Sequence, residues 1–125
     1  MLLVMGLLLC NKMLRNSTRK TTISKNLKFC NNIFSKAIGL MFSKKKDRAL
    51  VFTYKKEIRE SLHMLFVFYP IDVLFLNRDK KIVEIKQNFR PFTFYMPKNK
   101  AQYIVELPAG SVKGSKTKVE DKLSF

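Results

Sequence analysis

The residues best suited to chemistry in this chain are its single histidine, His63, and Asp72, which follows it. A carboxylate that orients an imidazole is a recurring device in general acid–base catalysis. Catalysis also needs a nucleophile, a metal or a second acid, and no motif ties the available side chains together. Those side chains are Glu60, Ser61, Tyr69 and Asp121. A buried histidine or aspartate must find a hydrogen-bond partner in any case. A small hydrolase that uses His63 and Asp72 is therefore the weakest of three functional interpretations, and the sequence favours a protein that is not an enzyme.

Aromatic and basic side chains are interleaved in residues 89–100. Phe89, Phe92, Phe94 and Tyr95 lie around Arg90, and Lys98 and Lys100 follow. Aromatic rings stack on bases or sugars while cations contact phosphates, so this segment is the best candidate for a nucleic-acid surface. Core packing explains the rings equally well, and no recognised nucleic-acid motif is present.

The leading interpretation is a small, non-catalytic binding or accessory domain whose ligand is unknown. Its predicted cleft takes a small ligand or a partner's peptide, and it is formed by His63, Asp72, Arg90, Phe92 and Tyr95. The alternative is a polyanion-binding protein in which lysines contact phosphates without reading sequence. A basic, aromatic-lined concave face would favour the alternative, whereas lysines spread evenly over the surface would favour the leading interpretation.

The formal net charge is +16, from 25 basic and 9 acidic residues. Such an excess attracts nucleic acid, anionic lipid headgroups or other polyanions. The plainer explanation is a lysine-biased, solvated surface, because the charges are scattered along the chain beside turn-like positions. The lysines of the C-terminal part, for example, are Lys113, Lys116, Lys118 and Lys122.

Cysteine and histidine are too few for a disulfide framework or a metal site. The chain has Cys10, Cys30 and one histidine, without any metal-ligand spacing. We therefore expect no cofactor, no metal, a monomer and a reduced, cytoplasmic location. A membrane association or export would depend on the apolar residues 1–12, which make a poor signal peptide. The predicted organisation is an extension over residues 1–14, either a leader or a misassigned start, followed by one domain over residues 15–125.

Residues 62–76 fix the core, since only His63, Pro70 and Asp72 interrupt their large apolar side chains. The run is too short and too broken to span a bilayer as a helix, and its aromatic and β-branched residues suit buried strands on either side of Pro70. Further strands are expected near residues 18–24, 49–54, 81–85, 103–107 and 119–125, with one helix over residues 33–41. Residues 55–59 are expected to form a charged connection, and turns are expected at residues 77–80, 108–110 and 114–115, with Gly110 at positive φ. The turn at residues 77–80 should make a meander of the strands on either side of it, and Pro91 should stay outside a central ladder. The predicted fold is a β-rich α+β domain, a compact barrel-like antiparallel sheet with one short helix.

These segments together resemble a known family, the domain of unknown function 192, also called uncharacterised protein family 0127. The motifs that carry the resemblance are Ala37-Ile38-Gly39-Leu40-Met41-Phe42, Ala49-Leu50-Val51-Phe52, His63 through Val73, and Leu107-Pro108-Ala109-Gly110. Their order and spacing match across residues 18–125, and the archaeal branch is the most similar. The resemblance implies a small β-rich domain of prokaryotes, sometimes exported or membrane-tethered, and it brings with it no known activity or cofactor.

Two departures from the family pattern stand out. Many bacterial members read Trp-Met-Lys-Asn-Thr where this chain has His63, Met64, Leu65, Phe66 and Val67, so a polar site built on that segment is not carried over. Near the end, members commonly have Gly-Asp where this chain has Glu120-Asp121. A tight turn there is expected to be strained or replaced, because glycine alone adopts a left-handed backbone without cost.

Overall fold

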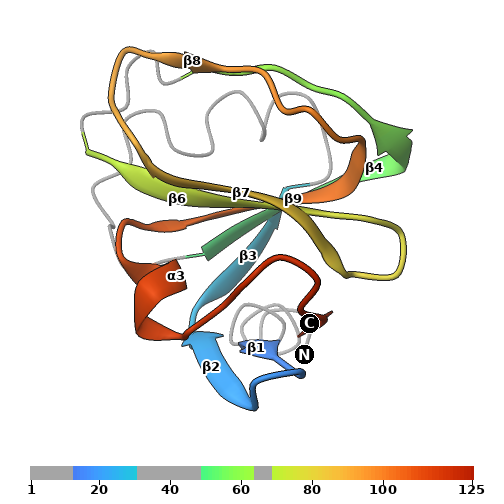
Figure 1. Cartoon of the computed structure of the whole chain (residues 1–125), viewed down its shortest axis with the longest axis vertical. Helices are drawn as coiled ribbons and strands as arrows, with labels where there is room; N and C mark the ends of the chain where they lie inside the picture. The colour runs from blue at the N-terminus through green and yellow to red at the C-terminus, as the bar shows by residue number, and fades with distance from the viewer. Residues whose placement is uncertain (1–12, 31–48, 64–68) are drawn as a thin grey trace, which may run out of the picture.

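Strands dominate the computed structural model, which describes residues 13–30, 49–63 and 69–125 (Figure 1). The described elements are β1 (Leu14–Asn16), β2 (Thr21–Ser24), β3 (Leu27–Cys30), β4 (Ala49–Ile58), β5 (Leu62–His63), β6 (Ile71–Leu76), β7 (Ile82–Phe89), β8 (Phe94–Tyr95), β9 (Ala101–Pro108), α3 (Ser111–Gly114) and β10 (Leu123–Ser124). The prediction of a β-rich fold with a short helix is confirmed.

A five-stranded sheet in the order β3-β4-β9-β6-β7 forms the centre of the molecule. Strand β6 lies next to β7 and β9 and runs antiparallel to both, with Leu74 opposite Ile85 on one side and Val105 on the other. All six residues of β6 are buried, and five of them are the large apolar residues that predicted a buried strand. Strand β3 pairs with β4 in parallel, which the expectation of an antiparallel sheet did not include.

Side chains alternate between the two faces of this sheet, so each face has its own core. On β6, Ile71, Val73 and Phe75 belong to one core, whereas Leu74 and Leu76 belong to the other. We call the first the β8-side core; its buried members are Leu50, Phe52, Tyr69, Ile71, Val73, Phe75, Phe89, Ala101 and Ile104. The second is the α3-side core, made of Leu14, Leu27, Ala49, Val51, Leu74, Leu76, Ile82, Val105, Leu107, Val112 and Leu123.

Smaller elements complete each side. A three-stranded sheet, β10-β1-β2, joins the first and last described strands, and an isolated bridge between Lys81 and Lys122 connects β7 to the chain end. On the other side, β5 pairs with β8, with His63 opposite Phe94. Figure 1 shows β8 along the outer edge of the molecule, above β6 and β7, and α3 on the opposite side of the sheet.

The boundaries differ from the sequence-based prediction at several described places. Residues 18–20, expected in a strand, form a turn after the unexpected strand β1, and the strand expected over residues 119–125 is limited to β10. Strand β4 continues through Lys55 and Lys56 to Ile58, where we expected a charged connection; both lysines are exposed, and an irregularity in the pairing with β9 accommodates them. The short helix α3 lies between the two turns predicted at residues 108–110 and 114–115. The helix expected over residues 33–41 lies outside the described residues.

The five-stranded sheet is not shown to close into a barrel, because β3 and β7 are its outer strands and do not pair with each other among the described residues. Within those same residues, the one helix is far too short to cross a membrane.

Candidate functional site

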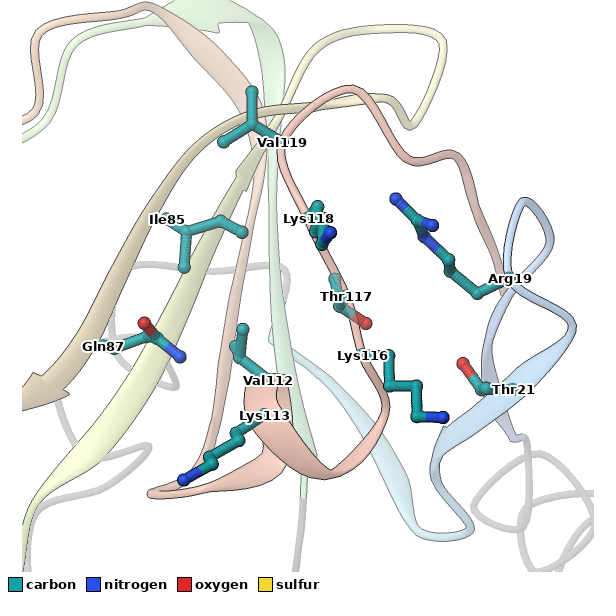
Figure 2. Close-up of a pocket in the computed structure, with 10 residues that line it drawn as sticks. All are labelled: Arg19, Thr21, Ile85, Gln87, Val112, Lys113, Lys116, Thr117, Lys118 and Val119. Atoms are coloured by element: carbon teal, nitrogen blue, oxygen red, sulfur yellow. The ribbon is translucent and has the colours of Figure 1, made fainter.

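An open groove of about 860 Å³ lies on the α3 side of the sheet, beside β7 and residues 112–119 (Figure 2). We call it the basic groove, and it is lined by Arg19, Thr21, Ile85, Gln87, Val112, Lys113, Lys116, Thr117, Lys118 and Val119. Figure 2 shows Ile85 and Gln87 on one side of the chain that carries Thr117, and Arg19 and Thr21 on the other. Segments far apart in the sequence therefore build one concave surface.

Positive charge is the main chemical property of the basic groove. Arg19, Lys113, Lys116 and Lys118 are all exposed, and no acidic side chain is among the ten lining residues. A concave surface of one charge sign concentrates counter-ions more strongly than the same charges on a flat surface. The groove is therefore suited to an anion.

The segment that carries the three lysines is held by its own backbone. After α3, the amide of Lys116 donates to the carbonyl of Lys113 at 3.2 Å and that of Thr117 to Val112 at 3.0 Å. Lys116 adopts a φ of 59°, the left-handed conformation that commonly ends a helix. Beneath it, the hydroxyls of Ser115 and Thr117 lie 2.7 Å apart and are buried. The lysines thus extend from a fixed turn.

Asp121 fixes the other cation of the groove. Its Oδ2 accepts hydrogen bonds from Arg19 Nε at 3.0 Å, from Asn16 Nδ2 at 2.9 Å and from the Lys118 amide at 2.9 Å. Burial alone would raise the pKa of Asp121, but these hydrogen bonds and the Arg19 charge outweigh it and lower the pKa. Asp121 therefore stays ionised and orients Arg19, whose two terminal nitrogens have no hydrogen-bond partner among the described residues.

The groove also has apolar and hydroxyl-bearing surface. Val112 is buried beneath it, Ile85 is half-buried, and Val119 is 45% exposed. Thr21 Oγ1 donates to the Ser115 carbonyl at 2.9 Å, which ties β2 to the lysine-bearing segment. A ligand there meets cations at the rim and methyl groups at the floor.

The structure places Asp72, one of the predicted cleft residues, on the α3 side of the sheet. Its Oδ1 accepts from the Asn88 amide at 3.0 Å, and its Oδ2 from the amides of Gly110 at 3.1 Å and Val112 at 3.0 Å. Gly110 has a φ of 93°, as predicted for the turn after Pro108. Asp72 is 1% exposed, so its carboxylate holds the start of α3 in place.

Tyr95, another predicted residue, lies on the opposite side. Its ring packs 5.9 Å from that of Phe75 and 6.1 Å from that of Phe89, in the β8-side core. Its hydroxyl donates to Glu84, and burial together with this bond raises the pKa of Tyr95 to about 12. The sheet therefore separates Tyr95 from Asp72.

The remaining predicted residues lie near Tyr95. The backbone of His63 pairs with Phe94, and Arg90 and Phe92 occupy the exposed turn between β7 and β8. The structure thus brings His63, Arg90, Phe92 and Tyr95 to one region and leaves Asp72 behind the sheet. A binding role for these residues stays a prediction.

The basic groove could not be found by sequence reasoning alone. In the sequence its lysines belong to a scattered, solvated surface, although Lys113, Lys116 and Lys118 recur at close spacing. Arg19, Thr21, Ile85 and Gln87 come from distant segments. The first two reach this place because β1 pairs with both β10 and β2, and because Arg19 and Thr21 are bonded to Asp121 and Ser115. The close spacing of the three lysines was the one signal available.

The fold and groove define a small, β-rich domain, and comparison with known proteins gives its family. The family model DUF192, described as "Uncharacterized ACR, COG1430", matches residues 14–125. The chain belongs to this family.

Archaeal relatives agree with this assignment, and solved structures show the same fold. A UPF0127 protein of Thermococcus sibiricus is 34% identical over 115 residues, 90% of this chain and 74% of that protein. One of Pyrococcus furiosus is 37% identical over 112 residues, covering 88% and 95%. A Sinorhizobium meliloti crystal structure, described as a "putative transcription regulator", has a TM-score of 0.79 at 22% identity and covers 90% of this chain and 89% of its own. A Novosphingobium aromaticivorans protein of unknown function has a TM-score of 0.78 at 17% identity, with coverage of 90% and 82%. At such identities the structures show the fold alone.

Proposed function

We propose that this chain is a non-catalytic binding domain whose basic groove takes a small anionic ligand. The observation that carries the proposal is that Arg19, Lys113, Lys116 and Lys118 all line one groove, with no acidic side chain among its ten described lining residues. Arg19 is paired with Asp121, but the three lysines have no ion-pair partner among the described residues, and like charges repel one another, so gathering these lysines does not stabilise the protein. A bound anion offsets this repulsion, so the gathered cations favour anion binding.

The chemistry of the lining narrows the ligand class. Lysine ammonium groups bind phosphate as point charges, and the guanidinium of Arg19 adds a planar pair of donors. The methyl groups of Ile85, Val112 and Val119 favour a ligand with an apolar part beside its anionic group. A phosphate- or carboxylate-bearing small molecule fits both features.

The hydrogen bonds of Asp72 argue against catalysis by a pair of His63 and Asp72. Three backbone amides already occupy the two oxygens of Asp72, and a carboxylate used in this way is a structural anchor. A proton-transfer role would require breaking contacts that hold α3. The hydrolase interpretation therefore has no support from this geometry.

Nucleic-acid binding is the second candidate, and one observation favours it. The groove is open and lies on a protein of net charge +16, so it admits a polymer as readily as a small ion. Of the aromatic residues predicted to stack on bases, Phe89 and Tyr95 pack into the core instead, which leaves Phe92 and Phe94 exposed. None of the ten described residues that line the groove is aromatic.

Calorimetric titration tests the proposal, with inorganic pyrophosphate and a single-stranded oligonucleotide as the two probes. The variant Lys113→Gln/Lys116→Gln removes two groove charges, and Lys55→Gln/Lys56→Gln removes two exposed charges from β4 as a matched control. We expect pyrophosphate binding that persists at physiological salt, falls about tenfold in the groove variant and is unchanged in the control. Equal loss in both variants, or binding that vanishes with modest salt, would overturn the proposal. Binding of the oligonucleotide alone, with the same variant pattern, would replace it with the second candidate.

A further inference from the structure

A second surface, around β8 on the opposite side of the five-stranded sheet from α3 (Figure 1), exposes large apolar side chains. Phe92 is 58% exposed, Phe94 73% and Met96 52%, and these three lie within five residues of one another. We call residues 90–100, which carry them, the aromatic arm. Contiguous exposed apolar groups are uncommon on soluble proteins and mark interaction sites.

The arm is firmly attached, so the exposure does not come from a loose loop. The Glu84 carboxylate accepts the amides of Lys98 and Asn99, each at 2.9 Å, as well as the Tyr95 hydroxyl. From the other side, Arg59 Nε donates to the Pro97 carbonyl at 3.1 Å. Tyr95 points into the core while Phe94 and Met96, its neighbours, point outward. The fold therefore presents these side chains in a defined orientation.

The backbone conformation of Phe92 also indicates that the fold holds this residue in a defined, exposed position. Its φ is 62°, in the left-handed region that glycine or asparagine adopts more easily than a bulky aromatic residue. Strain of this kind persists where the surrounding structure enforces it, often at binding sites. Because Phe92 is exposed, it does not contribute to folding the free energy that a buried phenylalanine would.

Charge identifies the chemistry of the partner. Between residues 86 and 100 the sequence has Lys86, Arg90, Lys98 and Lys100 and no aspartate or glutamate. Arg90, Lys98 and Lys100 are exposed beside the apolar side chains. A surface that combines exposed phenylalanine with cations matches the boundary between acyl chains and anionic headgroups.

We propose that the aromatic arm binds the surface of an anionic lipid bilayer. Phe92, Phe94 and Met96 enter the region below the headgroups, and Arg90, Lys98 and Lys100 contact lipid phosphates. A second copy of this chain is a poorer occupant, because the two sets of cations would repel each other. Single-stranded nucleic acid is also poorer. Met96 has no ring for stacking, and the arm lies along the outer edge of the molecule in Figure 1, whereas strand-binding sites are grooves.

The absence of tryptophan from the sequence makes a direct test available. Phe94→Trp places a single fluorescent reporter on the arm, and Val119→Trp places one at the basic groove as a control. Vesicles of phosphatidylcholine with phosphatidylserine should shift the emission of the arm reporter to the blue, and dibrominated phosphatidylcholine should quench it. The groove reporter should show neither change. Insertion of neither reporter, or equal responses from both, would overturn the proposal.

Vesicle co-sedimentation then separates the arm from the groove. Phe92→Ser/Phe94→Ser should reduce binding to phosphatidylserine-containing vesicles about tenfold, whereas Met13→Ser, another exposed apolar position, should not. The groove variant Lys113→Gln/Lys116→Gln should bind vesicles like the wild type, so failure of one proposal leaves the other testable. Loss in the groove variant with no loss in the arm variant would assign the lipid contact to the groove. Arm-dependent binding of an oligonucleotide, or arm-dependent dimerisation in light scattering, without vesicle binding, would replace the membrane with that partner.

Discussion

Arg19 and Asp121 are joined by a hydrogen-bonded ion pair in which Nε and Oδ2 lie 3.0 Å apart. The two side chains differ in exposure, at 39% for Arg19 and 4% for Asp121, so one end of the pair faces the basic groove and the other is enclosed. The same carboxylate bonds Asn16 and the backbone of Lys118. One buried acid therefore connects the N-terminal strand, the C-terminal segment and a groove cation.

Asp121→Asn is expected to destabilise the protein by about 2 kcal/mol at neutral pH, because the new amide presents a donor to partners that are themselves donors. The pKa of Asp121 is lowered in the folded state, so the stabilisation is present above the unfolded pKa of about 3.9 and is lost as the pH falls through the folded value. Urea denaturation at pH 7 and at a series of pH values below 4 measures both effects. The gap in stability between the variant and the wild type should narrow as the pH falls below 4, and a gap that stays constant with pH would contradict this account. Asp79→Asn, at an exposed turn, is the control.

Asp72→Asn is expected to cost about 2 kcal/mol, because an amide nitrogen would face at least one of the backbone donors it now satisfies. Amide hydrogen exchange should quicken at Gly110 and Val112, the two residues that share Oδ2. Unchanged exchange at these residues would show that Asp72 does not hold the start of α3.

Glu120→Gly should raise stability by about 0.5–1 kcal/mol, because Glu120 adopts a φ of 82° that glycine occupies without a steric penalty. The exposed ion pair to Lys81 is lost in the variant, but exposed pairs contribute little. Glu120→Ala removes the same ion pair and keeps the strained backbone, so it should give no gain. Equal thermal denaturation midpoints for the glycine and alanine variants would disprove the strain. The strain itself was expected from the sequence, in which Glu120 stands where family members commonly have glycine.

Glu106 should make stability fall with rising pH. It lies opposite Leu50 and Val73 in the sheet, and burial raises its pKa to about 8. The pKa of nearby Tyr54 is also raised, first by burial and then by the charges of Glu60 and Glu106. Because the Glu106 carboxyl holds its proton more tightly in the folded protein, it lowers the free energy of unfolding from about pH 4.5 upward, until the carboxyl is ionised in both the folded and the unfolded state. Glu106→Gln should therefore be more stable than the wild type by about 2 kcal/mol at pH 9 and equal to it near pH 4. A pH-independent difference between their urea midpoints would contradict the shifted titration.

Local pattern predicted the elements whose interactions are close in sequence. The apolar run of residues 71–76, the turn at residues 77–80 and the following strand form the expected meander, and Pro91 stays outside the central ladder. Gly110 takes the left-handed conformation that its turn requires. Each of these features depends on neighbouring residues alone.

The groove and the parallel pair could not be predicted in the same way, because they depend on which distant strands meet. The sequence of residues 27–30 does not indicate that they pair in parallel with β4. The positions of Arg19 and Ile85 in the sequence likewise do not indicate that they line the same groove as Lys116. Asp72 was placed correctly next to core strands, but one step along β6 decides which face a side chain occupies. Asp72 therefore lies on the opposite face of the sheet from Tyr95.

The most direct test of the basic groove as an anion site is nitrogen-15 amide spectroscopy of the protein during titration with inorganic pyrophosphate. Binding in the groove predicts shifts that saturate together at Arg19, Lys113, Lys116 and Lys118, with little change at Lys55 and Lys56. Shifts that spread over all exposed lysines and fail to saturate would contradict the groove as a binding site.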